Sequence, residues 1–214
     1  MARETLDELV SRIGSVSPDV MAKWIEESLT VEVSTAVVGV RRHFAESIGP
    51  DRERWPALKW DRPGPTKGQP PLMDAGNMMR SIAAEVRGNR IVLWTDKPYA
   101  ALQNFGGTIV PVNARYLTIP KTYKAKTAKS PRNYSGVLVP RVNKERTRGV
   151  LLAEGDDPDS PAVDGWHVAY ILTTGPVEIP ARMFLGFRDD TVDEILGNVL
   201  ETVADRWLLA DSRV

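Results

Sequence analysis

The longest apolar stripe in the sequence runs from Met21 to Ile48, and it constrains the fold more than any other feature. Ser17 followed by Pro18 is typical of a helix start, and Gly49-Pro50 is typical of a helix end. The stripe therefore predicts one helix of about 30 residues. Its apolar residues recur at steps of three and four, which places them on one helix face: Met21, Ile25, Leu29, Val33, Val37, Val40, Phe44 and Ile48.

A strand is the competing interpretation over a short part of this stripe. Leu29, Val31 and Val33 alternate, and β-branched residues are frequent around them. The helical period holds over the whole stripe, whereas the alternation covers only this part, so the pattern favours a helix.

Two further helices are predicted at the ends of the chain. Residues 3–13 carry apolar residues at helical spacing before Gly14, and residues 189–209 carry a longer stripe. Thr191 and Glu194 have the spacing of a capping box at the start of this last helix. The stripe of the C-terminal helix consists of Val192, Ile195, Leu196, Val199, Val203 and Trp207.

Short strands and turns fill the middle of the chain. A short helix is expected from Gly76 to Ala84, and a hairpin is expected around Gly88-Asn89. A helical turn is predicted from Tyr99 to Phe105, ended by Gly106-Gly107. The hairpin strands cover 83–87 and 90–94, and the other strand candidates cover 108–111, 116–119, 137–139, 150–152 and 166–172.

Together these patterns predict an α+β fold: an antiparallel sheet of short strands packed by a long N-terminal helix and a C-terminal helix. We expect a single domain over residues 1–214. Its expected parts are a helical part at 1–48, a Pro/Gly-rich loop at 49–73, a mostly β core at 74–188 with an inserted basic loop at 120–148, and a helix at 189–209.

The composition narrows the function classes. There is no cysteine, which excludes disulfides and thiolate chemistry. The net charge is zero, with 28 basic and 28 acidic residues, so no global attraction to nucleic acid or membranes follows. His43 and His167 lie outside any metal spacing. Apolar runs are too short to span a membrane, and the N-terminus lacks the pattern of a signal peptide. We therefore expect a non-enzyme without cofactor or metal.

One local charge excess stands out. Between Lys121 and Arg148 there are five lysines and four arginines against one acid, Glu145. A solvated loop is the plain interpretation. The alternatives are contact with nucleic acid, or contact with the acidic loop 154–164 of a neighbouring subunit. The candidate contact residues are Lys121, Lys124, Lys126, Lys129, Arg132 and Arg141.

Four stretches, in this order, resemble the phage virion morphogenesis (Mu G-like) family of tail-completion proteins. They are called here the first to fourth motifs: Leu72–Ile82, Pro98–Gly107, Ser130–Gly136 and Ile179–Gly186. Three departures occur. Ala75 stands where the family has Thr, Gln103-Asn104 where it has His-Gln, and Met183 where it has Pro. The absent His argues against chemistry at that position.

The resemblance implies a virion structural protein of a phage or prophage. It would act as a tail-completion or head-tail (neck) joining subunit in an oligomeric ring, hexameric or of another size. Implied partners are further copies and other tail or neck proteins, with DNA in the channel as an option and no membrane. The implied location is the virion, with the host cytoplasm during assembly. The alternative is a nucleic-acid-contacting module using the basic loop 121–148.

Seven motif residues are predicted to anchor the fold. Arg182 is expected to bond backbone carbonyls or an acid near the Tyr99–Gly107 turn, and so to hold the C-terminal helix to the sheet. The full set is Tyr99, Phe105, Gly106, Gly107, Pro180, Arg182 and Phe184.

Overall fold

A computed structural model describes residues 16–59 and 62–211 of the chain. The helix expected at 3–13 lies outside these residues. The sequence suggested a single domain, whereas contacts divide the chain into two compact units. The helical unit comprises Met1–Arg54, Met78–Lys97 and Phe184–Val214, and the sheet unit comprises Trp55–Asn77 and Pro98–Met183. Because both units are assembled from separated stretches, no linker in the sequence marks a boundary between them.

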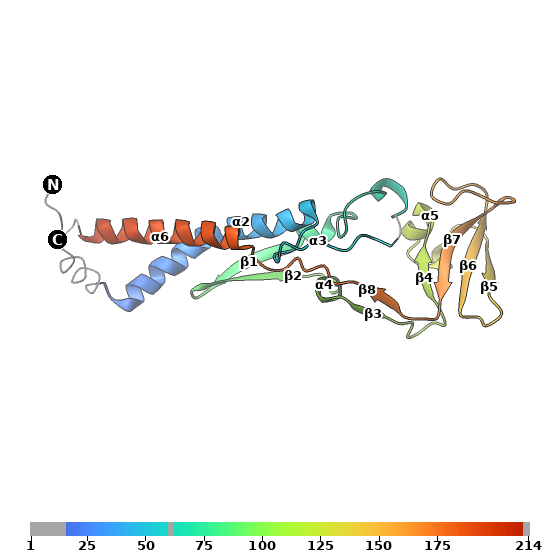
Figure 1. Cartoon of the computed structure of the whole chain (residues 1–214), viewed down its shortest axis with the longest axis horizontal. Helices are drawn as coiled ribbons and strands as arrows, with labels where there is room; N and C mark the ends of the chain where they lie inside the picture. Colours follow the sequence, from blue (N-terminus) through green and yellow to red (C-terminus); the bar gives the residue numbers. More distant parts are fainter. Residues whose placement is uncertain (1–15, 60–61, 212–214) are drawn as a thin grey trace. The chain divides into compact units, whose positions relative to one another are not determined.

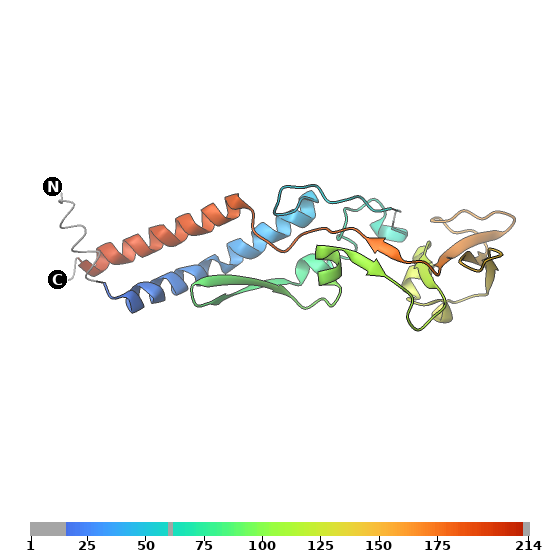
Figure 2. The same cartoon turned by 60° about the horizontal axis from the view of Figure 1, so that its bottom comes forward.

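Two long helices dominate the helical unit. Helix α2 (Pro18–Glu46) and helix α6 (Asp189–Asp211) lie side by side and run in opposite directions (Figures 1 and 2). The predicted start of α2 is confirmed, because the Ser17 hydroxyl accepts a hydrogen bond from the Val20 amide at 3.3 Å. The helix ends at Ser47, which has a left-handed backbone with φ of 54°. The strand alternative around Val31 is therefore wrong.

The two helices approach each other closely at Gly39. A Cβ atom at that position would lie 2.6 Å from the Thr191 Cγ2 atom, so only glycine fits. The capping box expected at Thr191 and Glu194 is not formed. Helix α6 begins two residues earlier, and the Asp190 carboxylate accepts the Thr191 amide at 2.7 Å. Residues of both helices also form an apolar cluster, which includes Leu29, Ala36, Ile195 and Val199.

A β-hairpin completes the helical unit. Strands β1 (Ile82–Arg87) and β2 (Arg90–Thr95) pair antiparallel around Gly88-Asn89, as predicted, and β1 packs against α2. The helix expected from Gly76 to Ala84 is wrong in length, because α3 covers only Asn77–Arg80. From Ile82 the backbone pairs with β2, so tertiary pairing overrides local helix propensity there.

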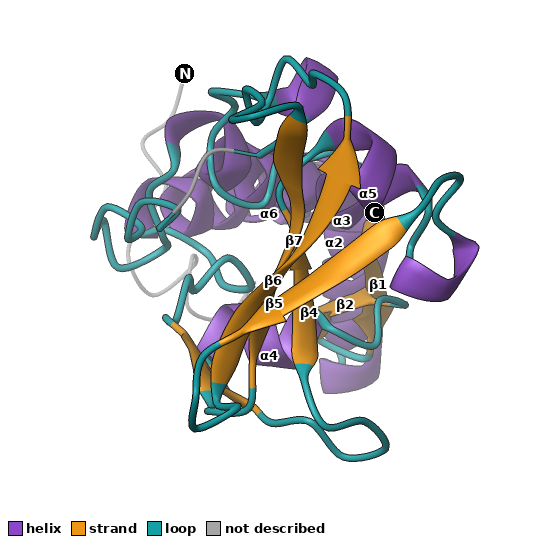
Figure 3. Ribbon diagram, turned by 90° about the vertical axis from the view of Figure 1, so that its right-hand side faces the viewer, coloured by secondary structure: helices purple, strands orange, loops and turns teal. Residues whose placement is uncertain are grey.

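The sheet unit contains two antiparallel sheets. Its larger sheet has the strand order β4-β7-β6-β5 (Figure 3), and the smaller one pairs β3 with β8. The expected α+β architecture is confirmed, although the strands form separate sheets. The strands are β3 (Gly107–Ile109), β4 (Leu117–Pro120), β5 (Leu138–Val142), β6 (Arg148–Glu154), β7 (Trp166–Thr173) and β8 (Val177–Ile179).

Short helices accompany these sheets. They are η1 (Gly64–Thr66), α4 (Ala100–Phe105), α5 (Tyr123–Thr127) and η2 (Pro131–Asn133). The expectation of an inserted loop at 120–148 is thus wrong. That stretch contains α5, which Thr122 caps, and η2, which Ser130 caps. It also contains β5, where a strand was expected at 137–139. The core of the larger sheet lies on the face covered by α5, where Ala125 packs with Ala153 and Tyr170.

None of the helices in the described part of the chain is long and apolar enough to cross a membrane.

Candidate functional site

The second and fourth motifs meet in the sheet unit. Gly107 pairs with Ile179 where β3 joins β8, and the Arg182 amide donates to the Gln103 carbonyl at 2.9 Å. Gly106 has φ of 73°, and a Cβ there would lie 2.8 Å from the Ala181 nitrogen. Glycine is therefore required at Gly106 for both its backbone conformation and this close approach. These two motifs build a backbone junction.

Arg182 is the buried cation of this junction, with 5% of its surface exposed. Its Nε donates to the Pro56 carbonyl at 2.9 Å, and its Nη2 donates to the Ala57 carbonyl at 3.2 Å. The side chain thus bonds backbone carbonyls, as predicted, but those of 56–57 and not those of the Tyr99–Gly107 turn. Burial lowers the pKa of Arg182, yet a guanidinium remains charged at any ordinary pH.

The other predicted anchors occupy different environments. Phe105 is 73% exposed, so its side chain contributes surface and not core. Tyr99 is also exposed, and Pro180 is half-buried. Here Gly106 and Gly107 serve through their backbones, whereas the aromatic rings beside them point to solvent.

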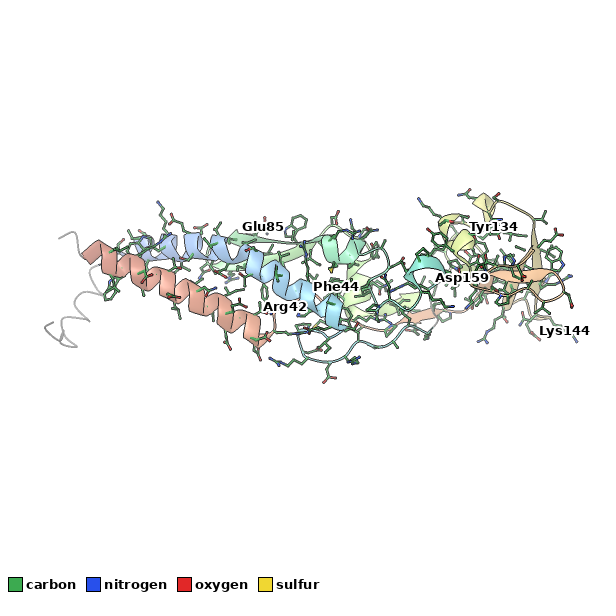
Figure 4. The ribbon with its side chains drawn as sticks, turned by 90° about the horizontal axis from the view of Figure 1, so that it is seen from above. Arg42, Phe44, Glu85, Tyr134, Lys144 and Asp159 are labelled. Atoms are coloured by element: carbon green, nitrogen blue, oxygen red, sulfur yellow. The ribbon has the colours of Figure 1, made fainter. Side chains whose placement is uncertain are left out.

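Phe184, at the end of the fourth motif, belongs to the helical unit and is fully buried. Its ring lies 5.2 Å from that of Phe44 on α2, the residue labelled in Figure 4. The His43 Nδ1 lies 3.0 Å from the Phe184 carbonyl, so Nδ1 carries the proton and donates. Burial is the main cause that lowers the pKa of His43. The imidazole is therefore a neutral structural group, not an exposed base.

Asp74 of the first motif is the acceptor at the centre of a small hydrogen-bond network in the sheet unit. Its Oδ1 accepts from the Thr66 hydroxyl at 2.7 Å and from the Lys126 ammonium at 2.5 Å. Burial by itself would raise the pKa of Asp74, but the hydrogen bonds from Lys126 and Thr66 outweigh it and keep the pKa below its usual range. Lys126, a predicted contact residue, is thus occupied inside its own chain.

The third motif covers the core face of the larger sheet. Tyr134 stacks edge-on against Tyr170 at a centroid distance of 6.0 Å, and the Lys124 ammonium lies 4.8 Å from the Tyr134 ring centre. Burial raises the pKa of Tyr134. Lys124 therefore has a cation–π partner within the chain.

The predicted basic residues do not form one surface. Lys124, Lys129 and Arg132 belong to the α5–η2 segment on the covered face, where Lys129 and Arg132 are exposed. Lys121 is half-buried at the end of β4. Arg141 lies on β5 opposite Val150 of β6, and its side chain is on the sheet face opposite α5.

The acidic loop makes contacts inside its own chain. The Asp159 carboxylate, labelled in Figure 4, accepts the Tyr123 amide at 3.0 Å and the Gly64 amide at 3.1 Å. Asp156 accepts the Ala162 amide at 2.9 Å. Two of the acidic residues that were expected to contact a neighbouring subunit, Asp156 and Asp159, therefore accept hydrogen bonds from their own chain. Over the described residues no group of three His, Asp or Glu side chains could hold a metal ion.

One exposed surface was missed by sequence reasoning. Val192, Leu196 and Leu200, called here the α6 stripe, are 36%, 51% and 68% exposed. They lie four residues apart on one helix face. The pattern assigned Val192 and Leu196 to the buried face, but α2 covers only the side that carries Ile195 and Val199. The apolar residues of α6 span a wider arc than the side that α2 covers. The width of this arc can be read from the sequence.

Comparison with known proteins gives one short similarity. No family model matches the chain, and no solved structure matches it. A stretch of 37 residues is 46% identical to a phage protein, the Mu-like prophage FluMu G protein 2 of Haemophilus influenzae (strain ATCC 51907 / DSM 11121 / KW20 / Rd). The stretch covers 17% of this chain, and the chain spans about a quarter (27%) of that relative's length.

Proposed function

We propose that this chain is a structural subunit of a tailed phage or prophage virion, added at tail completion or at the head-tail neck as part of an oligomeric ring. The four motifs and the 37-residue similarity to a Mu-like prophage protein support this role. The chain acts by assembly and not by catalysis.

The α6 stripe is the observation that carries the proposal. An apolar row of Val192, Leu196 and Leu200 on a helix exposes surface that soluble monomers usually bury. Subunits of an assembled particle cover such rows with neighbouring proteins. In the assembled ring, a neighbouring protein of the virion covers this stripe.

The test is genetic complementation in the phage or prophage that encodes the chain. Deleting the gene should give unjoined heads and tails in negative-stain images, and the wild-type gene should restore complete particles. The double variant Leu196→Glu/Leu200→Glu should fail to restore them. Asn198→Glu, an exposed change on another side of α6, is the matched control and should restore them. Normal virions from the deletion strain would overturn the proposal.

Nucleic-acid contact is the second candidate, and the exposed cations of the α5–η2 segment favour it. Lys129 and Arg132 are exposed there, and Tyr123 beside them is half exposed. Phosphate contacts of this kind weaken steeply with salt. Binding of DNA at low salt that is lost in the variant Lys121→Ala/Lys124→Ala/Lys126→Ala/Lys129→Ala would support it, and absence of low-salt binding would exclude it.

A further inference from the structure

Strand β6 carries a charge-polarised apolar row on its open face. Because side chains alternate along a strand, Arg148, Val150, Leu152 and Glu154 share one face. Leu151 and Ala153 point to the opposite face, where they pack in the cluster that includes α5. The row therefore lies on the face that α5 does not cover. It begins with a cation, continues with two apolar residues and ends with an anion.

Neighbouring strands widen this row into a surface. Register places Arg141 beside Val150, Val139 beside Leu152, and Ile171 beside Val150. A bulge at Ala169 keeps Val168 beside Leu152, and Ile119 of β4 pairs with Ile171. The apolar centre of this open face is half-buried, since its side chains shield one another laterally. It consists of Ile119, Val139, Val150, Leu152, Val168 and Ile171.

The two charged ends of the open face cannot pair within one chain. Arg148 and Glu154 lie six residues apart along an extended strand, which separates their Cα atoms by about 20 Å. Neither forms a salt bridge to any residue that the structure describes. More positive charge accompanies Arg148, from Arg141 on the same face and from Lys144 at the β5–β6 turn (Figure 4). The face therefore has a positive end and a negative end.

We propose that the open face of the β4-β7-β6-β5 sheet binds the same face of a second copy of this chain. In a two-fold contact with the two β6 strands antiparallel, Arg148 of each copy lies opposite Glu154 of the other. The apolar centres then cover one another. A sheet face that is apolar in the middle and oppositely charged at its ends is self-complementary under this symmetry.

This inference deepens the proposed role as a self-associating subunit and rests on it, but it names a different surface from the α6 stripe. A two-fold contact through the sheet unit pairs two copies. It leaves α6 available for other proteins of the particle.

The experiment measures self-association of the full chain by sedimentation equilibrium and light scattering over a dilution series. Arg148→Glu and Glu154→Arg should each weaken dimerisation by about tenfold or more, because each places like charges opposite one another. The double variant Arg148→Glu/Glu154→Arg should recover the wild-type dimer. A mixture of the two single variants should form a heterodimer that is tighter than the homodimer of either variant.

Controls separate this contact from misfolding. Arg132→Glu makes the same charge change on the α5 side, so it should leave the dimer intact. Val150→Asp should abolish the dimer while circular dichroism shows a folded chain. A monomeric wild-type chain throughout the series, or a dimer unaffected by Arg148→Glu and Val150→Asp, would overturn the inference. An intact, charge-dependent dimer beside normal virions from the deletion strain would instead overturn only the phage role.

Discussion

The helical unit and the sheet unit are stabilised by different kinds of contact. The helical unit depends on apolar burial at helical spacing, with Phe44 against Phe184 and an apolar cluster between α2 and α6. The motif residues of the sheet unit are held by polar contacts, of which Arg182 on two carbonyls and Asp74 with Lys126 are the clearest. Apolar burial tolerates changes of pH and salt, whereas charged nodes respond to both.

The comparison predicts where substitutions should cost most. Truncating a buried ring removes transfer energy and leaves a cavity. Removing a half-exposed ion pair removes much less, because water and salt already screen it.

Phe184→Ala should be the most destabilising change, lowering the free energy of unfolding by about 3–5 kcal/mol. The ring is fully buried against Phe44, and its loss leaves a void beneath α2. Urea unfolding followed by circular dichroism measures the change. Met183→Ala, at an exposed neighbouring side chain, is the control and should alter stability by less than about 0.5 kcal/mol. Equal effects of the two variants would contradict the assignment of Phe184 to the core.

Arg182→Met should cost about 2–3 kcal/mol, because the Pro56 and Ala57 carbonyls lose a charged donor. Arg182→Lys should recover only part of this, since an ammonium lacks the planar fork that reaches both carbonyls. Arg141→Met, at an exposed arginine of the same unit, provides the control for loss of charge. If it destabilises the chain as much as Arg182→Met, the buried contacts are not the cause.

The Asp74–Lys126 pair should contribute a coupling energy of about 0.5–1 kcal/mol in a double-mutant cycle of Asp74→Asn and Lys126→Met. The pKa of Asp74 is lowered in the folded chain, so its contribution is complete above the unfolded pKa. It is lost as pH falls through the lower folded pKa. Asp74→Asn should therefore reduce the acid sensitivity of stability, and high salt should shrink the coupling.

His43 gives the clearest pH signature of the helical unit. Its pKa is lowered by burial, so its contribution is complete above the unfolded value of about 6.5 and declines as pH falls below it. His43→Gln should flatten the dependence of stability on pH between pH values of about 5 and 7. A variant with the wild-type slope would show that another group titrates there.

The sequence predicted the long helices and the first hairpin well, because periodicity and turn residues are local signals. Helix α2 follows its stripe from Ser17 onward, and the hairpin follows Gly88-Asn89. The short helix at 76–84 was too long, because the chain pairs with β2 from Ile82 onward. The loop at 120–148 was wrong, because α5, η2 and β5 form within it. The capping box failed because α6 begins at Asp189, which places Thr191 inside the helix.

The candidate site was predictable only in part. Backbone carbonyls were among the partners expected for Arg182, but their position at 56–57 was not predicted. The basic residues look continuous in sequence, yet Arg141 lies on the other sheet face from Arg132, because strand alternation and the β5–β6 pairing decide the face. The partial exposure of the α6 stripe likewise depends on which helix covers it.

By itself, then, the sequence determined the elements with strong local periods and the absence of cysteine chemistry. Tertiary structure alone decided which charged side chains form ion pairs within the chain. Lys126 is neutralised by Asp74, whereas Arg148 and Glu154 remain at opposite ends of an open sheet face. The physical reason is that charge and hydrophobicity are properties of residues. Their availability to a partner depends on neighbours brought together from distant parts of the chain.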